Sequence, residues 1–415
     1  MRSIVPSAAV LRQKYALVSA LRAQGFAIGS CEDGKPGAQD LFLIADGEVP
    51  PAAARTLVLG EGARVAIPFR DGHPARLSYS SEDSAIGAGF ASAMARGPYE
   101  PVAADPESLA LLALAERVAA SDITVLINGP TGTGKEVLAK AIHMGSARRD
   151  GPFVAINCAA LPEAMLEAML FGHQKGSFTG ASSGGQGFFR AANGGTLLLD
   201  EIAEMPLGLQ AKILRALQER EVVPIGGTSP EKIDVRVIAC ANRDLQGEVT
   251  AGRFRADLYY RLAVFPLATK ALAERAGDIA ALAAAMVLRH AGTRSSLPWI
   301  TPEAVEILID HDWPGNVREL ENVIQRALLL APGDVIDAEH LIFDRRPEMR
   351  QQDRPEKLSN IVQMHEFQAI RETLAECNGS RIETAKRLGI SERTLRYRLA
   401  KAREQGDDIA QAVSA

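Results

Sequence analysis

The sequence predicts an α/β protein with a mainly parallel sheet. Runs of β-branched and apolar residues at 123–128, 153–157, 196–200 and 235–241 indicate strands. Stretches with helical spacing of apolar residues, such as 208–220, separate these strands. Strands that alternate with helices favour a parallel sheet, in which the carboxyl ends of the strands meet at one edge.

The composition indicates a folded protein of several domains. The chain has 415 residues, of which 47% are hydrophobic and 23% are charged. No apolar run approaches the roughly 18 residues of a membrane-spanning helix, and the N-terminus lacks the apolar core of a secretory signal. The cysteines form no C-x-x-C pair, which argues against zinc sites and disulfides; they are Cys31, Cys158, Cys240 and Cys377. We therefore expect a cytoplasmic protein with no membrane partner.

Shifts in composition predict the domain boundaries. The segment 80–97 is rich in Gly, Ala and Ser, which predicts a linker, and a polar stretch with two prolines predicts another. The expected parts are an N-terminal domain (1–95), an α/β domain (104–268), a helical subdomain (269–343), a linker (344–357) and a small all-helical domain (358–406).

A Gly-rich segment between a strand and a helix predicts a phosphate-binding loop. Its residues are Gly129, Pro130, Thr131, Gly132, Thr133, Gly134, Lys135 and Glu136. Glycines let backbone N–H groups surround phosphates, the helix N-terminus adds positive potential, and Lys135 reaches the β and γ oxygens. Position 136 is Glu where the strict pattern has Ser or Thr, so a plain Gly-rich turn is the alternative for this loop taken alone.

Two acids at the end of the strand 196–200 remove most of that ambiguity. Asp200 is expected to hold Mg²⁺, and Glu201 is expected to polarise the attacking water. A solvated turn is the alternative for two such acids. Together with the Gly-rich loop they predict a nucleotide-hydrolysing domain.

The C-terminal part is locally basic and predicts a helix-turn-helix. Between residues 380 and 403 eight Lys or Arg stand against two acids, although the whole chain has a net charge of -5. A helix at 381–388, a short turn and a second helix at 392–404 would present basic side chains to a DNA groove. The expected DNA-binding residues are Arg381, Ser391, Arg393, Thr394, Arg396, Tyr397 and Arg398. The alternative is an amphipathic hairpin with a solvated basic face.

Further motifs resemble those of bacterial enhancer-binding proteins, the AAA+ activators of sigma-54 RNA polymerase. The segment 171–181 is similar to the loop that defines this family, with Ser where the family usually has Ala; its central residues are Gly176, Ser177, Phe178, Thr179, Gly180 and Ala181. The segments 157–161, 254–262 and 313–320 resemble other family motifs, and the tail is similar to a Fis-type module. The resemblance implies an AAA+ P-loop NTPase domain with a helical lid subdomain and an all-α C-terminal helix-turn-helix.

The resemblance also implies roles for single residues. The loop 176–181 would contact sigma-54, and Arg255 and Arg261 would act as arginine fingers on ATP bound by a neighbouring subunit. Arg318 matches the sensor arginine of the lid. Asn157 matches the residue that restrains Glu201, and Asn242 matches the polar sensor. The alternatives are surface arginines and buried asparagines that bond to the backbone.

The N-terminal region resembles the receiver domain of response regulators. The segment 40–46 is similar to the third receiver strand, with Asp46 at the phosphoacceptor position, and 65–69 is similar to the last strand. The acidic pair after the first strand is missing, Ile67 stands where a Lys is needed, and the chain is expected to open directly into a helix at 8–24 without an initial strand. We expect a degenerate, unphosphorylated receiver-like α/β domain; the alternative is an unrelated sensor fold. Regulation would then come through contacts with a regulatory protein at this domain, or the ATPase would be under little local control.

The resemblance implies a sigma-54-dependent transcriptional activator. Such a protein binds enhancer DNA, assembles from dimers into a hexameric ring, and uses ATP and Mg²⁺ to open the closed sigma-54 polymerase complex; activators of flagellar genes often carry such N-terminal domains. The alternative is a general AAA+ remodelling ATPase with a DNA-binding tail, which would have no reason to carry the loop 176–181. A repressor with an inactive ATPase would have lost Lys135 or Glu201, and both are present.

Overall fold

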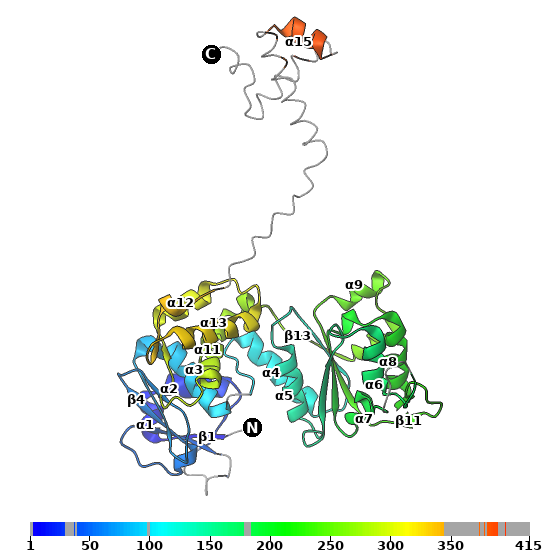
Figure 1. The fold of residues 1–415 in the computed structure, drawn as a ribbon. Helices are drawn as coiled ribbons and strands as arrows, with labels where there is room; N and C mark the ends of the chain where they lie inside the picture. The colour runs from blue at the N-terminus through cyan, green and yellow to red at the C-terminus, as the bar shows by residue number, and fades with distance from the viewer. Residues whose placement is uncertain are drawn as a thin grey trace. The chain divides into compact units, whose positions relative to one another are not determined.

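The computed structural model describes residues 3–29, 37, 40–97, 100–177, 184–343, 373, 377, 380–388 and 395. The chain divides into two compact units, residues 1–343 and 344–415, which are treated separately below (Figure 1). Among the described residues, no helix has both the length and the apolar character that a membrane span requires.

The first unit begins with a six-stranded sheet in the order β2-β1-β3-β4-β6-β5. The strands are β1 (Ser3–Pro6), β2 (Ala27–Ile28), β3 (Leu41–Ala45), β4 (Thr56–Glu61), β5 (Val65–Ile67) and β6 (Ala75–Tyr79). All pairs are parallel except β5 with β6, so the parallel part follows the doubly wound order 2-1-3-4-5. The helices of this part are α1 (Ala8–Gln13), α2 (Tyr15–Ala23) and α3 (Ser84–Arg96).

This sheet corrects two expectations. An initial strand is present, because β1 pairs with both β2 and β3; only four residues long, it is too short to show a periodic pattern. The segment 65–69 does not supply the last parallel strand. That strand is β6, and β5 is an antiparallel edge strand beside it.

The linker expected at 80–97 is also wrong, because most of this segment is the buried helix α3. Its small residues serve close packing rather than flexibility. A Cβ on Gly87 would lie 2.8 Å from the Tyr79 ring, and one on Gly89 would lie 3.0 Å from the carbonyl oxygen of Ala280 in α11 (Ile279–His290). Gly at these positions lets α3 approach the sheet on one side and a lid helix on the other.

The N-terminal part and the lid therefore share one hydrophobic core. Trp299 is at its centre, with its ring centroid 6.1 Å from that of Tyr79 and 5.3 Å from that of Phe90. The Trp299 indole N–H donates to Oδ1 of the buried Asp83 at 3.1 Å. Residues far apart in sequence thus pack side by side, as Figure 1 shows for α3 and α11.

The second sheet adjoins the Gly-rich loop 129–136, and one of its strands ends at Asp200. Its five parallel strands have the order β13-β7-β12-β9-β8, with β7 (Val125–Asn128), β8 (Phe153–Asn157), β9 (Thr196–Asp200), β12 (Arg236–Ala241) and β13 (Phe265–Ala268). The strands predicted at 123–128, 153–157, 196–200 and 235–241 are confirmed, whereas β13 was not predicted. The helices around this sheet are α4 (Pro106–Ala119), α5 (Lys135–Met144), α6 (Glu163–Phe171), α7 (Phe188–Ala191), α8 (Leu207–Glu219), α9 (Leu245–Thr250) and α10 (Ala256–Leu262); a two-stranded hairpin joins β10 (Glu221–Val222) to β11 (Glu231–Lys232).

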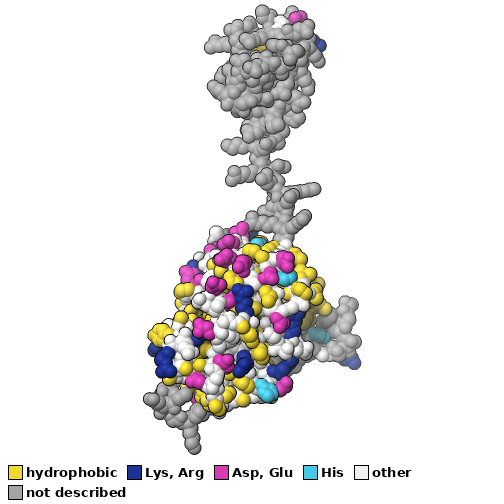
Figure 2. All heavy atoms as spheres, turned by 90° about the vertical axis from the view of Figure 1, so that its left-hand side faces the viewer, with side chains coloured by type: hydrophobic (Ala, Val, Ile, Leu, Met, Phe, Trp, Pro, Cys, Tyr) yellow, Lys and Arg dark blue, Asp and Glu magenta, His cyan; other side chains and the backbone are white. Residues whose placement is uncertain are grey.

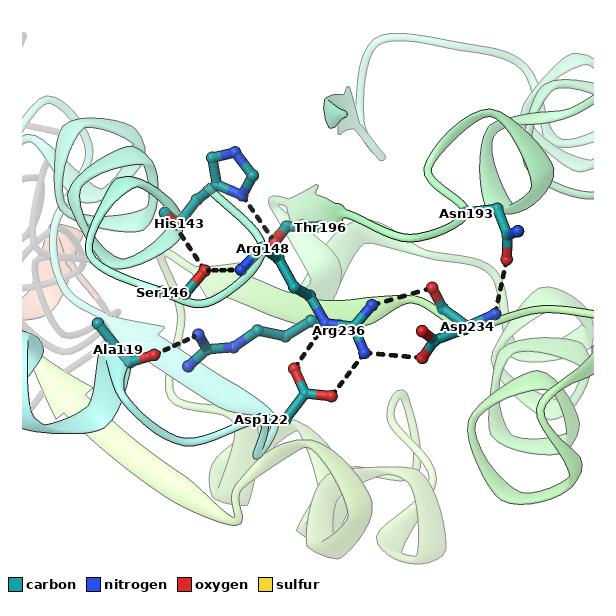
Figure 3. A network of polar contacts seen from close by, with 9 residues as sticks. All are labelled: Ala119, Asp122, His143, Ser146, Arg148, Asn193, Thr196, Asp234 and Arg236. Atoms are coloured by element: carbon teal, nitrogen blue, oxygen red, sulfur yellow. Dashed lines mark hydrogen bonds and ion pairs between the residues drawn. The ribbon is translucent and has the colours of Figure 1, made fainter. Parts of the chain in front are cut away.

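A polar network supports the amino ends of these strands (Figure 3). Arg236 opens β12 and is buried, and its guanidinium donates to the carbonyl oxygens of Val118 and Ala119 at the end of α4. Arg148 pairs with Asp122 and Asp234 at 2.6 and 2.7 Å, which ties the segments before β7 and β12 together. The network lies at the opposite end of the strands from Asp200, so it holds the sheet without entering the site.

The lid follows β13 and is mainly helical. It consists of a 3₁₀ segment (Leu272–Asp278), α11, α12 (Pro302–Asp310), α13 (Asn316–Leu330) and the short parallel strands β14 (Trp299–Ile300) and β15 (Val335–Ile336). Thr301 caps α12 by accepting from the Ala304 amide, and Pro302 occupies its first turn. Glu303, Glu306 and Asp310 are exposed on α12, and acidic side chains gather over this part of the unit in Figure 2.

The second unit is described only in part. It contains α15 (Arg381–Arg387), and Ala385 and Leu395 are buried within it.

Candidate nucleotide-binding site

The phosphate-binding loop connects β7 to α5 and needs its glycines for two reasons. Gly129, Gly132 and Gly134 have positive φ angles of 148°, 79° and 97°. A Cβ on Gly129 would lie 2.1 Å from Thr269 Oγ1, and one on Gly132 would lie 2.5 Å from the carbonyl oxygen of Gly315. The loop therefore combines left-handed backbone with close approach of two other segments, which Gly alone permits.

Lys135 begins α5 and faces the loop. Its Nζ donates to the carbonyl oxygens of Gly129 at 2.8 Å and Pro130 at 2.9 Å. Burial lowers the pKa of Lys135, while the nearby Asp200 and Glu201 act in the opposite direction. Thr133 bonds through its hydroxyl to the Pro130 carbonyl and to Thr269 Oγ1. The ammonium group of Lys135 therefore lies where it would balance the negative charge of a bound phosphate.

Asp200 and Glu201 follow β9 at the same edge of the sheet. Burial raises the pKa of Asp200, and its Oδ1 accepts the Glu201 amide N–H at 3.0 Å. Glu201 has a φ of 52°, a left-handed conformation that is uncommon for a residue with a side chain. Strain of this kind often accompanies functional positions, because the surrounding structure must impose it.

These groups line one cavity that has polar and apolar lining residues. The polar lining includes residues 131–136, Asp200, Glu201 and Arg318. The apolar lining includes Leu111, Leu112, Leu282, Met286 and Val317. A cavity that offers amides, a cation and aliphatic side chains suits a nucleotide, which has charged phosphates and an apolar base face.

Sequence reasoning missed the apolar lining and two polar residues, Arg275 and Asn316. The apolar residues come from α4, α11 and α13, which look like ordinary amphipathic helices in the sequence. Arg275 and Asn316 reach the loop only after the lid folds back over it. No local spacing signals that contact.

Asn157 and Asn242 do not line the cavity among the described residues. Asn157 ends β8 beside Asp200, and its Oδ1 accepts the Ala159 amide at 2.8 Å. Asn242 follows β12, and its buried Oδ1 has no hydrogen-bond partner in the part of the chain that the structure describes. An unsatisfied buried acceptor next to β7 suits a group that meets its partner only when a ligand is bound.

Arg255 and Arg261 lie away from the cavity of their own chain, at α10. Arg255 forms a two-pronged pair with Asp257, at 3.0 Å and 2.7 Å, and this contact raises its pKa. Arg261 donates to the Leu217 carbonyl at 3.0 Å. Both guanidiniums are exposed, so they are available to another molecule and not to the nucleotide site of this chain.

Only the start of the loop 176–181 falls within the described residues. Gly176 has a φ of 80°, and the Ser177 amide donates to the Gln174 carbonyl. His173 forms isolated β-bridges with Gly185 and with Ile225, which lies shortly after β10. Phe178, Thr179, Gly180 and Ala181 lie outside the described residues.

The expected DNA contacts fall mostly outside the described residues as well. Arg381 is the first residue of α15, and its side chain is not described. The others that lie outside are Ser391, Arg393, Thr394, Arg396, Tyr397 and Arg398.

Three family profiles match consecutive parts of the chain. Residues 102–268 match the Sigma-54 interaction domain, residues 273–358 match the AAA+ ATPase lid domain, and residues 362–401 match the Fis family of bacterial regulatory proteins. The residues that match the lid domain begin just after the ATPase sheet and include the helices that close the cavity.

Curated relatives give the same result. The chain is 51% identical over 337 residues to the response regulator protein FleR of Pseudomonas aeruginosa, covering 74% of this chain and 71% of the relative. It is 42% identical over 325 residues to the transcriptional regulatory protein FlbD of Caulobacter vibrioides, covering 74% and 71%. It is also 42% identical over 314 residues to the sigma54-dependent transcriptional activator SfnR of Pseudomonas putida, covering 71% and 86%.

Solved structures extend the likeness in fold to the N-terminal part. NtrX from Brucella abortus in complex with ADP aligns with a TM-score of 0.54 at 25% identity, covering 97% of this chain and 99% of that one. The complex of the same protein with ATP aligns with a TM-score of 0.53 at 24% identity, covering 97% and 99%. Together with the cavity, the sequence matches identify the chain: it belongs to the sigma-54-dependent transcriptional activators, with an AAA+ ATPase domain, its lid and a Fis-type helix-turn-helix.

Proposed function

We propose that this activator binds ATP in the cavity between the ATPase sheet and the lid, and that hydrolysis there drives promoter opening. The observation that carries the proposal is the meeting of Lys135, Asp200 and Glu201 at one edge of the sheet, in a cavity that aliphatic side chains also line. Nucleotide complexes of NtrX, which has the same fold, support ATP as the ligand.

The residues present fit a magnesium nucleotide. Asp200 offers a carboxylate, the oxygen ligand that Mg²⁺ prefers, and phosphate oxygens would complete the coordination. The ion, when bound, neutralises charge on the phosphates. Lys135 binds the same oxygens, and the N–H groups of residues 132–134 surround them.

Glu201 is the proposed general base. Water attacks the γ-phosphorus in line with the leaving oxygen of ADP, and the Glu201 carboxylate accepts the proton that the water loses. The bond between the γ-phosphorus and the bridging oxygen breaks, and its electron pair stays on ADP. Arg318 lies on the lid side of the cavity, where it would report the state of the phosphates.

We propose that the active site is completed by a neighbouring subunit. Arg255 and Arg261 are exposed and lie away from the cavity of their own chain, as residues that act in trans must. The family's hexameric ring supplies such a neighbour. Mixing Lys135→Ala subunits with Arg261→Ala subunits should restore part of the ATP turnover that each lacks alone, since some interfaces then combine an intact loop with an intact arginine. Mixtures as inactive as their components would contradict action in trans.

The coupling proposal concerns the loop 176–181, whose Phe178 and Thr179 are expected to contact sigma-54. Its test is promoter opening on a sigma-54 template with enhancer sites, with ATP turnover recorded in the same reactions. Wild type should open the promoter, Thr179→Ala should hydrolyse ATP without opening it, and Glu201→Ala should do neither. Turnover by wild type without opening, under every enhancer arrangement, would point instead to a general remodelling ATPase with another client.

Enhancer binding, regulation and target genes complete the proposal. The Fis-type tail would bind paired half-sites as a dimer through residues that include Arg393 and Arg396. The N-terminal domain would act as an unphosphorylated receiver-like domain that a regulatory protein can bind. Flagellar promoters are the first targets to test, by footprinting the chain on their upstream regions.

A further inference from the structure

Three donors of the lid hold three consecutive carbonyl oxygens of the phosphate-binding loop. Asn316 Nδ2 donates to the Thr131 carbonyl at 3.0 Å. The Arg318 amide donates to the Gly132 carbonyl at 3.3 Å. Arg275 Nη2 donates to the Thr133 carbonyl at 2.8 Å. The lid thus contacts the loop through carbonyl oxygens, which a phosphate does not bind, although Arg275 and Arg318 also line the cavity.

Peptide planarity gives these contacts a consequence for phosphate binding. In a trans peptide unit the C=O and the following N–H point in opposite directions. A donor that holds the carbonyl of residue 131, 132 or 133 therefore also sets the direction of the N–H of Gly132, Thr133 or Gly134. These are the amides of a loop that cradles phosphates, and their residues line the cavity.

Asn316 has the burial and the backbone conformation that this contact requires. It is 4% exposed and adopts a φ of 54°, which Asn tolerates better than most residues with a side chain. While its Nδ2 holds the loop, its Oδ1 accepts the Leu272 amide at 2.8 Å. One side chain therefore joins α13, the 3₁₀ segment of the lid and the phosphate loop.

Arg275 is held as firmly from the other side. Its Nη1 lies 3.3 Å from Oδ2 of Asp278, a fully buried carboxylate. Asp278 in turn accepts the amides of Ala104 and Asp105 at 2.7 and 2.8 Å, just before α4. The guanidinium that reaches Thr133 is therefore anchored to the segment that enters the ATPase sheet.

We propose that Asn316 and Arg275 are positioning residues that orient the phosphate-binding amides of Gly132 and Gly134 by holding the opposite ends of the same peptide units. This deepens the proposed function, since it assumes that the cavity binds a nucleotide through its phosphates. Neither side chain needs to touch the nucleotide for this role. Opening the lid would release the amides together with the contacts that Arg318 makes.

The test compares ligands with and without phosphates on the full chain. The variants are Asn316→Gly, which keeps the left-handed backbone and removes both amide contacts, and Arg275→Lys, which keeps a cation beside Asp278 and loses the two-pronged donor. The control is Asn322→Gly, an exposed residue of the same helix α13. Calorimetry would measure the Kd of each protein for ATPγS in the presence of Mg²⁺ and, in a separate titration, the Kd for adenosine. The midpoint temperature of thermal unfolding would also be recorded for each protein.

We expect both variants to bind ATPγS about tenfold more weakly than the control, the usual effect of losing one well-placed hydrogen bond, and to bind adenosine within about twofold of it. ATPγS binding equal to that of the control would overturn the inference. An equal loss for adenosine would also overturn it, because that would mean general damage to the cavity. If wild type bound adenosine but gained nothing from the triphosphate, the proposed function itself would fail.

Discussion

The first unit contains a six-stranded and a five-stranded sheet, and in each an aspartate lies where a parallel strand ends, in different surroundings. Asp200 ends β9 in a cavity beside Lys135, and burial raises its pKa. Asp46 follows β3, and its side chain is 61% exposed and paired with Arg76 at 3.1 Å. One carboxylate thus lies among other groups of a cavity, whereas the other forms an exposed ion pair at the surface.

The difference shows that a strand-end carboxylate needs companions to act. The ATPase sheet supplies a lysine, a second acid and a loop of amides that converge on one cavity. The N-terminal sheet supplies an ion pair at the surface, and its helix α3 shares the core of the lid instead. The N-terminal sheet is thus packed against the lid through a shared core, and whether it accepts a phosphoryl group is the question that the last experiment below addresses.

The largest expected effect concerns Glu201 in the active sheet. Glu201→Gln should lower ATP turnover at least a hundredfold, because a positioned base contributes about that much or more. Binding of ATPγS should persist, since the carboxamide preserves the size of the side chain. Phosphate release measures the turnover, and calorimetry on the same preparation measures the binding of ATPγS. Unchanged turnover would mean that another residue is the general base.

The next prediction tests whether the N-terminal sheet is a separable domain. Trp299→Ala should destabilise residues 1–343 by roughly 3 kcal/mol, because it empties the middle of the shared core and leaves Asp83 without its indole donor. Unfolding should remain a single transition in chemical denaturation, read by circular dichroism. Two separate transitions in wild type would show that the two parts fold independently.

Sequence patterns predicted the ATPase sheet well and the N-terminal part poorly, for physical reasons. The strand 196–200 is buried over its first four residues, and its run of three leucines is easily recognised. The strand 153–157 lies at the edge of the sheet and is mostly half-buried, but it too carries a short apolar run. The sequence of α3 predicts a linker, because Gly87 and Gly89 indicate flexibility. Their role in close packing is visible only once the neighbouring residues are known. β1 has four residues, too few for a periodic signal.

The candidate site divides in the same way. The loop 129–136 and the acids 200–201 are contiguous in sequence, and each has a spacing that follows from phosphate chemistry. The contacts of Asn316 and Arg275 join segments more than a hundred residues apart, and they arise only from how the lid folds back. No pattern within either segment encodes such a contact.

A smaller effect is expected from the network beneath the ATPase sheet. Arg236→Met should lower the free energy of unfolding by about 2 kcal/mol, because the carbonyl oxygens of Val118 and Ala119 lose their buried donor while the apolar stem is kept. Arg149→Met, at an exposed position of the same region, is the control and should change stability by less than about 0.5 kcal/mol. Urea denaturation measures both, and equal effects would mean that the network is not needed.

The smallest effect is a dependence of the shared core on alkaline pH. Burial, with a contribution from Glu61, raises the pKa of Tyr79 to about 12. The protonated phenol is therefore favoured in the folded state. Its contribution is complete below pH 10 and is lost as the pH rises from about 10 to 12, where the unfolded tyrosine is already ionised.

Wild type should accordingly lose up to about 2 kcal/mol more stability over this interval than Tyr79→Phe, which cannot ionise. Both proteins keep Lys14, which lies 4.5 Å from the centre of the ring. Parallel pH profiles for the two proteins would show that Tyr79 is not shielded in the shared core.

The most direct test of the central claim measures promoter opening and ATP turnover for wild type and Asp46→Asn, with and without acetyl phosphate as a phosphoryl donor. The account predicts that both proteins open a sigma-54 promoter with ATP alone, at equal turnover, and that acetyl phosphate changes neither. If opening by wild type required acetyl phosphate and Asp46→Asn abolished it, the N-terminal sheet would be an active receiver, and the contrast drawn between the two sheets would be wrong.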